Sequence, residues 1–196
     1  MYTTPNPLAG MSGLQTLANV LSRETLSLPV GLRWAARVAG LLNQMHLNDR
    51  RHGKVCSKHV VLGEAGLELV EPVQTFWREC SPERDVRGFG ALLYEIVTGA
   101  APPDEDEEIA VPPPSLDVSG MEAIRTATMR LAAKCMRPSP TLPTMRQAAM
   151  EVRLLSLRAR RFELREAAGR AKGPIPMEPK AAVPADWLAI AAQEVA

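Results

Sequence analysis

The chain has 196 residues, a length typical of one domain or of one domain with a small appendage. Its hydrophobic content of 46% is enough for a packed core and argues against disorder throughout the chain. The net charge of +1 means that bulk electrostatics favour neither nucleic acid nor an anionic membrane as the partner.

The first third of the chain is predicted to be helical after a short lead-in. Residues 1–12 are rich in proline, glycine and threonine and are expected to be loose. Apolar residues at three- and four-residue spacing predict a short helix over 13–21 and a longer one over 29–47. Pro29 suits the first turn of the longer helix.

The middle of the chain alternates between extended and helical patterns. Two short runs rich in β-branched or alternating residues flank Gly63-Glu64-Ala65-Gly66 and predict a small hairpin over 58–70. Residues 71–84 have no clear period and are expected to form a loop. The next predicted helix, from Val86 to Val97, is apolar on most sides and should lie at the centre of the domain, ending at Thr98-Gly99.

The last part of the chain contains two further predicted helices separated by loops. Residues 100–119 include the acidic run Asp104 to Glu108 and are expected to be a surface loop. Helices are predicted over 121–136 and 146–165. Residues 166–196 are predicted to form a proline-containing linker followed by a short helix at Asp186–Val195. The predicted fold class is therefore mainly α with a small β-hairpin, and the predicted domain covers 13–165.

Several short segments occur in an order that is typical of one family. His52 to His59 stands where that family has H-R-D-L-x-x-x-N, and Ser81-Pro82-Glu83 is similar to its A-P-E motif. Asp85 to Gly90 is similar to the start of its central helix. Further segments that fit the same order are Gly13-Leu14, Leu42 to His46, Cys135-Met136 and Pro143-Thr144-Met145. Over about residues 13–157, the chain resembles the C-terminal lobe of a protein kinase.

The departures from the kinase pattern concern its catalytic chemistry. The resemblance places Lys54 where a kinase has the aspartate that accepts the substrate proton, and His59 where it has the asparagine that binds magnesium. A charged ammonium has no acceptor, and imidazole is a poor magnesium ligand. Glu71 aligns with the D-F-G aspartate and keeps a carboxylate, but the glycine of that motif is missing. No intact catalytic residue is therefore predicted.

Other parts of a kinase are also missing from the pattern. Only 12 residues precede Gly13, and neither G-x-G-x-x-G nor V-A-I-K occurs in the sequence. The N-terminal β lobe, which would cover the ATP phosphates, is therefore expected to be absent. Eleven residues separate Glu71 from Glu83, and Leu142 replaces the arginine that normally pairs with the A-P-E glutamate.

The remaining motif residues are expected to be structural. Asp85 matches the kinase aspartate that binds the amides of the catalytic loop, and the simpler alternative is a helix N-cap. His52 is expected to hold the loop, and Gly90 belongs to the central-helix motif. A zinc site is a weaker hypothesis; its candidate ligands are His46, His52, Cys56 and His59.

These observations lead to three hypotheses for function. The first is a catalytically inactive protein kinase-like domain that acts as a protein-interaction or regulatory module, with self-association possible and without a cofactor. The second is a fragment of a divergent Ser/Thr-type kinase that uses ATP and magnesium, with its N-lobe missing or supplied in trans. The third is an unrelated helical adaptor.

Partners and location are predicted from charge and from the cysteines. The arginine-rich helix at 146–165 has an apolar stripe and interleaved glutamates, which favours packing over nucleic-acid binding. A protein partner is therefore expected, and neither nucleic acid nor a membrane. Trp187, Leu188 and Ile190 in the tail are candidates for docking onto the domain or covering its apolar surface. The three widely spaced cysteines and the absence of a signal peptide or an apolar span predict a cytoplasmic protein.

Overall fold

The computed structural model describes residues 15–23, 25–63, 66–70, 80–102, 120–137 and 142–171. Residues 1–163 form one compact unit and residues 164–196 a second one. Several predictions fall outside the described residues: the lead-in at 1–12, the loop with Glu71, the acidic run at 104–108, the linker at 173–184 and the tail helix with Trp187, Leu188 and Ile190.

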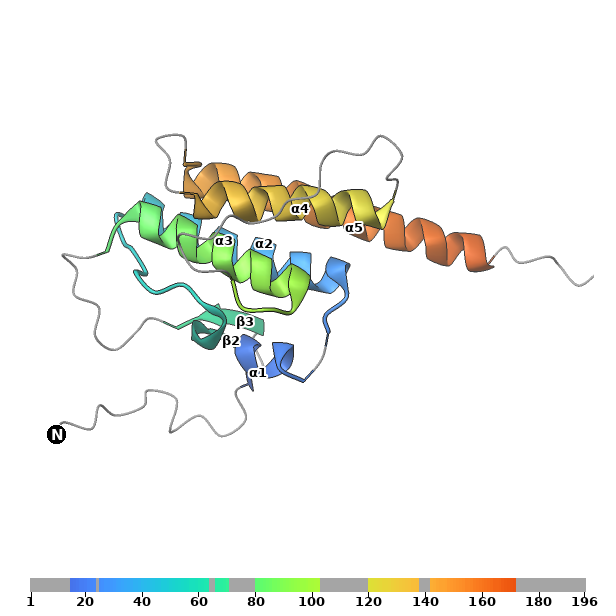
Figure 1. The fold of residues 1–196 in the computed structure, drawn as a ribbon, viewed down its shortest axis with the longest axis horizontal. Coiled ribbons are helices and arrows are strands. Elements are labelled where there is room, and N and C mark those ends of the chain that lie inside the picture. The colour runs from blue at the N-terminus through green and yellow to red at the C-terminus, as the bar shows by residue number, and fades with distance from the viewer. Residues whose placement is uncertain are drawn as a thin grey trace, which may run out of the picture. The chain divides into compact units, whose positions relative to one another are not determined.

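The first unit is mainly helical and has a small three-stranded sheet, so the coarse prediction of a mainly α fold is confirmed. Helices α2 (Leu28–Leu47) and α3 (Pro82–Thr98) lie between the sheet and helix α4 (Met121–Met136), as Figure 1 shows. Helix α5 begins at Met145, and Glu151 near its start lies 3.9 Å from Lys134 of α4.

Helix α2 forms where the apolar spacing predicts it, but α3 begins at Pro82, four residues before the predicted start at Val86. The predicted loop over 71–84 is therefore wrong for 82–84, because the Ser81 cap and Pro82 add a first turn that the apolar spacing does not mark. Pro29 occupies the first turn of α2, and Ser81 caps α3 by accepting a hydrogen bond from the amide of Arg84. Helix α3 ends at Gly99, whose φ is 72°. The buried side chains of the two helices form the centre of the core, which includes Leu32, Ala35, Val38, Leu42, Val86, Phe89, Leu92 and Leu93.

The predicted hairpin is present, and a third strand extends it. Strand β2 (Val60–Gly63) pairs with β3 (Gly66–Leu69) in antiparallel register, with Val60 opposite Leu69. The prediction of a helix over all of 13–21 is wrong for Gln15–Thr16, which form strand β1 and pair with β2. Helix α1 covers only Leu17–Leu21, because Thr16 caps it by accepting from the amide of Asn19.

The later helices agree with the sequence pattern except at one end. Helix α4 has the predicted bounds, whereas α5 (Met145–Ala171) continues six residues beyond the predicted end at 165. Thr144 and Gln147 start α5 with reciprocal hydrogen bonds between side chain and backbone, which is a capping box. Among the described helices, none combines the length and the apolarity required to cross a membrane.

Candidate functional site

The candidate site lies where the loop after α2 meets the first turn of α3. Asp85 belongs to that first turn and is completely buried. Its Oδ2 accepts a hydrogen bond of 2.9 Å from the amide of His52, and its Oδ1 accepts one of 2.6 Å from the amide of Gly53. The carboxylate therefore holds two successive amides of the loop.

A third donor completes the surroundings of this carboxylate. His46, in the last turn of α2, places Nε2 2.8 Å from Asp85 Oδ2. Since an ionised carboxylate only accepts, the imidazole donates here. Among the described residues, every buried side-chain nitrogen or oxygen has a hydrogen-bond partner. The buried charge of Asp85 is thus compensated by hydrogen bonds from α2 and from the loop.

The same contacts determine the ionisation of Asp85. Burial raises the pKa of this carboxyl, but the hydrogen bonds from His46, His52 and Gly53 lower it more, and the pKa lies below its usual value. Asp85 therefore stays ionised at neutral pH. Because its pKa is lower in the folded chain than in the unfolded one, the stability it contributes is lost at acidic pH.

This shift predicts a specific pH dependence. The free energy of unfolding of the wild-type chain should exceed that of Asp85→Asn at neutral pH. The difference should shrink as the pH falls below the ordinary aspartate pKa of about 4 and through the lower pKa of Asp85 in the folded chain. Urea denaturation at a series of pH values measures it. Glu163→Gln, which removes an exposed carboxyl, is the control. A difference between wild type and Asp85→Asn that does not change with pH would contradict the prediction.

His52 fixes the loop from a second direction. It is 1% exposed, and its Nε2 lies 2.9 Å from the carbonyl oxygen of Val70, just after β3. Its Nδ1 accepts a hydrogen bond of 3.3 Å from the amide of Lys54. These two partners assign the neutral tautomer with its proton on Nε2. His52 therefore links the loop to the sheet.

The loop also touches α3 directly through a glycine. A Cβ atom placed on Gly88 would lie 2.8 Å from the carbonyl oxygen of Val55 and 2.9 Å from its Cβ. Any larger residue at this position would push the loop away from the helix. Farther along α3, Glu95 accepts a hydrogen bond of 3.0 Å from the hydroxyl of Ser57.

Lys54 and His59 are the two loop residues at which the sequence differs from the kinase pattern. Lys54 is exposed, and its amide is held by His52. His59 places Nδ1 3.1 Å from Sγ of Cys56, and its ring packs edge-on against that of His52 at 5.8 Å. Burial lowers the pKa of His59, as do the nearby His52 and Lys54. This surface of the loop therefore presents an ammonium and an imidazole that favours its neutral form.

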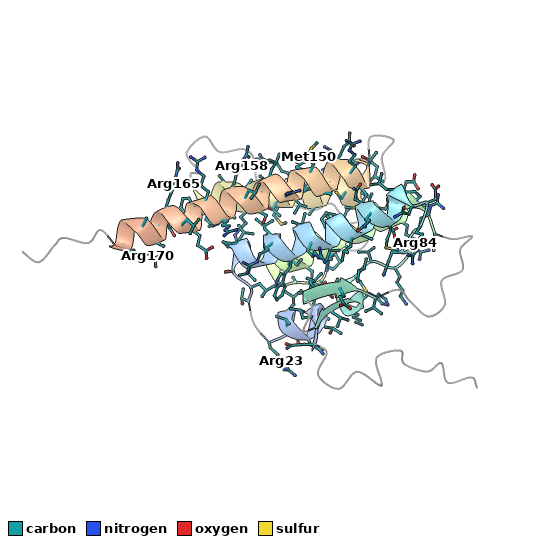
Figure 2. All side chains as sticks on the ribbon, turned by 180° about the vertical axis from the view of Figure 1, so that it is seen from behind. Arg23, Arg84, Met150, Arg158, Arg165 and Arg170 are labelled. Atoms are coloured by element: carbon teal, nitrogen blue, oxygen red, sulfur yellow. The ribbon has the colours of Figure 1, made fainter. Side chains whose placement is uncertain are left out.

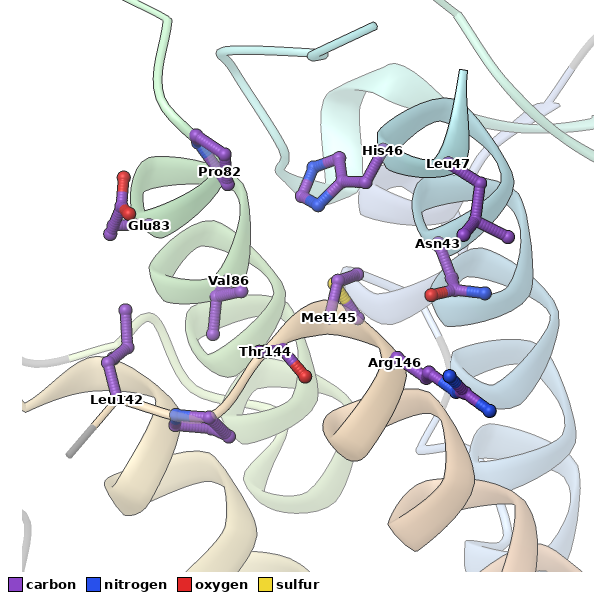
Figure 3. Close-up of a pocket in the computed structure, with 11 residues that line it drawn as sticks. Asn43, His46, Leu47, Pro82, Glu83, Val86, Leu142, Thr144, Met145 and Arg146 are labelled. Carbon is purple, nitrogen blue, oxygen red and sulfur yellow. The ribbon is translucent and has the colours of Figure 1, made fainter. Parts of the chain in front are cut away.

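A hollow of about 470 Å³ opens beside this site, between the end of α2 and the starts of α3 and α5 (Figure 3). Glu83 and Leu142 both line it, and Arg146 lies across it from Glu83. The pKa of Glu83 is lowered by hydrogen bonds from the backbone amide of Glu83 itself and from the hydroxyl of Ser81. The other lining residues are Asn43, His46, Leu47, Pro82, Val86, Pro143, Thr144 and Met145.

The structure brings together most of the residues that the sequence singled out. His52, Lys54 and His59 lie on the loop that Asp85 holds, and Ser81, Pro82 and Glu83 begin α3. Gly90 lies apart, at the contact between α3 and α4. The contacts of Val70, Ser57 and Glu95 with the loop, and the hydrogen bond between His46 and Asp85, were not predicted from the sequence. The position of His46 in the last turn of α2, beside the loop, was the signal available for it.

The predicted zinc ligands do not form a metal-binding cluster in the part of the chain that the structure describes. No group of three or more His, Cys, Asp or Glu side chains placed to hold a metal ion occurs in the described ranges. His46 and His52 direct their Nε2 atoms at Asp85 and Val70 instead.

The sequence matches no protein-family model and no curated protein.

Proposed function

We propose that this chain is a catalytically inactive, protein kinase-like domain that works as a protein-interaction or regulatory module. The observation that carries the proposal is the anchoring of the loop around Lys54 by Asp85. Asp85 binds the amides of His52 and Gly53, the two residues immediately before Lys54. This contact supports the resemblance to a kinase catalytic loop, because the aspartate of a kinase central helix would bind the amides of that loop in the same way.

The chemistry of Lys54 argues against phosphotransfer. Because the backbone before it is held on Asp85 and its own amide is held on His52, Lys54 has a defined place in the loop. Its ammonium carries three donors and no acceptor, so while charged it cannot take a proton from a substrate hydroxyl. A working loop would present a carboxylate there.

His59 supports the same proposal at the position assigned to magnesium binding. Its Nδ1 contacts the thiol of Cys56, and magnesium prefers oxygen ligands in an octahedral arrangement. ATP and magnesium belong only to the alternative function, a divergent kinase fragment with its N-lobe supplied in trans. That alternative depends on Glu71, which lies outside the described residues.

A reducing, cytoplasmic location is part of the proposal. The sequence has three cysteines, Cys56, Cys80 and Cys135, which are widely spaced and include no C-x-x-C pair. Few and widely spaced cysteines are typical of a compartment that keeps thiols reduced. A cytoplasmic protein partner, or a second copy of the chain, is the expected ligand of such a module.

The direct test is whether the purified chain binds and uses ATP. We expect no increase in melting temperature with millimolar ATP and magnesium, because a ligand stabilises a protein only if it binds the folded state. We also expect no transfer of labelled phosphate from ATP to a generic peptide substrate. An active protein kinase measured in parallel shows that both assays work.

Two variants make this test specific to the site. Lys54→Ala and Glu71→Ala change the positions that a catalytic mechanism would use, and neither should alter the two assays. Phosphotransfer by the wild-type chain that disappears in either variant would overturn the proposal and favour the divergent kinase.

A further inference from the structure

Helix α5 carries apolar side chains on a face that points away from the core. Met150, Leu154 and Leu157 are 62%, 53% and 56% exposed. Their spacing of four and then three residues places them on one side of the helix. This is the spacing of the a and d positions in a coiled coil, and we call these three residues the α5 seam.

The opposite face of the same helix is already used. Ala148, Val152, Leu155 and Ala159 are buried in the core of the first unit. The helix therefore cannot rotate to bury the α5 seam without losing these contacts. A surface helix usually has one apolar stripe, whereas α5 has two, and the second is unpartnered among the described residues.

Arginines border the α5 seam on both sides. In heptad terms Arg153 and Arg160 occupy one flank and Arg158 the other, and all three are exposed. Figure 2 shows Met150 and Arg158 along the outer side of α5. One acidic residue on this stretch, Glu151, faces Lys134 of α4 at 3.9 Å instead. The surface is thus a narrow apolar stripe with a positive border.

We propose that the α5 seam binds an amphipathic helix of a partner protein that has leucines or similar residues on one face and glutamates or aspartates beside them. Such a helix buries its apolar stripe on Met150, Leu154 and Leu157 and places its carboxylates against the arginines. This inference rests on the proposed function, since it identifies the surface and the partner class of the interaction module.

Charge and shape favour this partner over two others. A second copy of the chain, paired through the same seam, would place arginine flanks against arginine flanks, and like charges oppose such pairing. An anionic membrane attracts arginines too, but it suits a helix that can immerse a broad apolar face. Here Val152 and Leu155 are buried in the core and only a narrow stripe is exposed.

The test uses the whole chain and a synthetic peptide. The labelled probe is a helical peptide with leucines at a and d and glutamates at e and g, and binding is followed by fluorescence anisotropy. We expect saturable binding that weakens at least about tenfold in Leu154→Glu, because a charge is placed in the centre of the contact. Leu154→Ile should keep the affinity, and melting curves check that both variants fold.

A charge exchange tests the acidic specificity. The double variant Arg153→Glu, Arg158→Glu should lose its affinity for the glutamate peptide and should bind a matching peptide with lysines at e and g. Arg33→Glu, on an exposed position of α2, is the matched control and should change neither affinity.

Three results would overturn the inference. These are equal binding of a scrambled peptide, binding to phosphatidylserine vesicles but not to the peptide, and self-association that Leu154→Glu abolishes. Each is distinguishable from failure of the proposed function, which the ATP assays measure separately. A chain that transfers phosphate yet binds the peptide through the α5 seam would refute the function and retain the surface.

Discussion

Asp85→Ala is expected to lower the free energy of unfolding by about 3–5 kcal/mol, the cost typical of removing one member of a buried charged network. The substitution leaves the amides of His52 and Gly53 without their acceptor in a buried place, and it removes the partner of His46. Each unsatisfied buried donor costs about 1–3 kcal/mol. Urea denaturation followed by circular dichroism measures the change.

A graded series separates the hydrogen bonds from packing. Asp85→Asn keeps the size of the side chain and one acceptor oxygen, so its loss should be smaller than that of Asp85→Ala. Glu163→Ala, at an exposed position of α5, should change stability by less than about 0.5 kcal/mol. Hydrogen exchange at the Gly53 amide should accelerate in both Asp85 variants. Equal stability of wild type and Asp85→Ala would show that the loop is not held in this way.

Gly90→Ala is expected to destabilise the chain by about 1–3 kcal/mol, the usual cost of overpacking a close contact. A Cβ at this position would lie 2.7 Å from Cβ of Cys135 and 2.9 Å from both the carbonyl oxygen of Ala132 and Cγ of Met136. Alanine favours a helix over glycine by about 0.5–1 kcal/mol, so a net loss means that the contact outweighs propensity.

Gly40 provides the matched control for this prediction. It lies inside α2, and a Cβ placed there would meet nothing within 4 Å. Gly40→Ala should therefore stabilise the chain by about 0.5–1 kcal/mol. The two glycine variants should thus have effects of opposite sign in the same denaturation experiment. If both stabilised the chain, the approach of α3 to α4 would be looser than the structure shows.

The predictions for Asp85 and Gly90 concern two different contacts of the same helix, α3. Asp85 holds the loop on the first turn of α3, and Gly90 allows α4 to pack against the next turns. Helix α3 thus positions the candidate site on one side and the α4 layer on the other.

Local sequence signals were sufficient for most helix bounds. The three- and four-residue spacing of apolar side chains, Pro29 and Gly99 act over short distances in the chain, so they predict α2 and the end of α3 from neighbouring residues. The Ser81 cap, which starts α3 four residues before the predicted helix, was not predicted. The hairpin could be predicted for the same reason, because the two strands lie close together in the chain, and Gly63 pairs with Gly66 where they meet.

Contacts between distant segments needed the tertiary structure. Strand β1 exists because Gln15–Thr16 find Val61 and Leu62, more than forty residues away, and two residues carry too little pattern to predict this. The pairing of Asp85 with His46, 39 positions earlier, also has no local signature. The sequence predicted one apolar stripe on the last helix, and only the packing shows that a second apolar face, with Met150, Leu154 and Leu157, is left exposed.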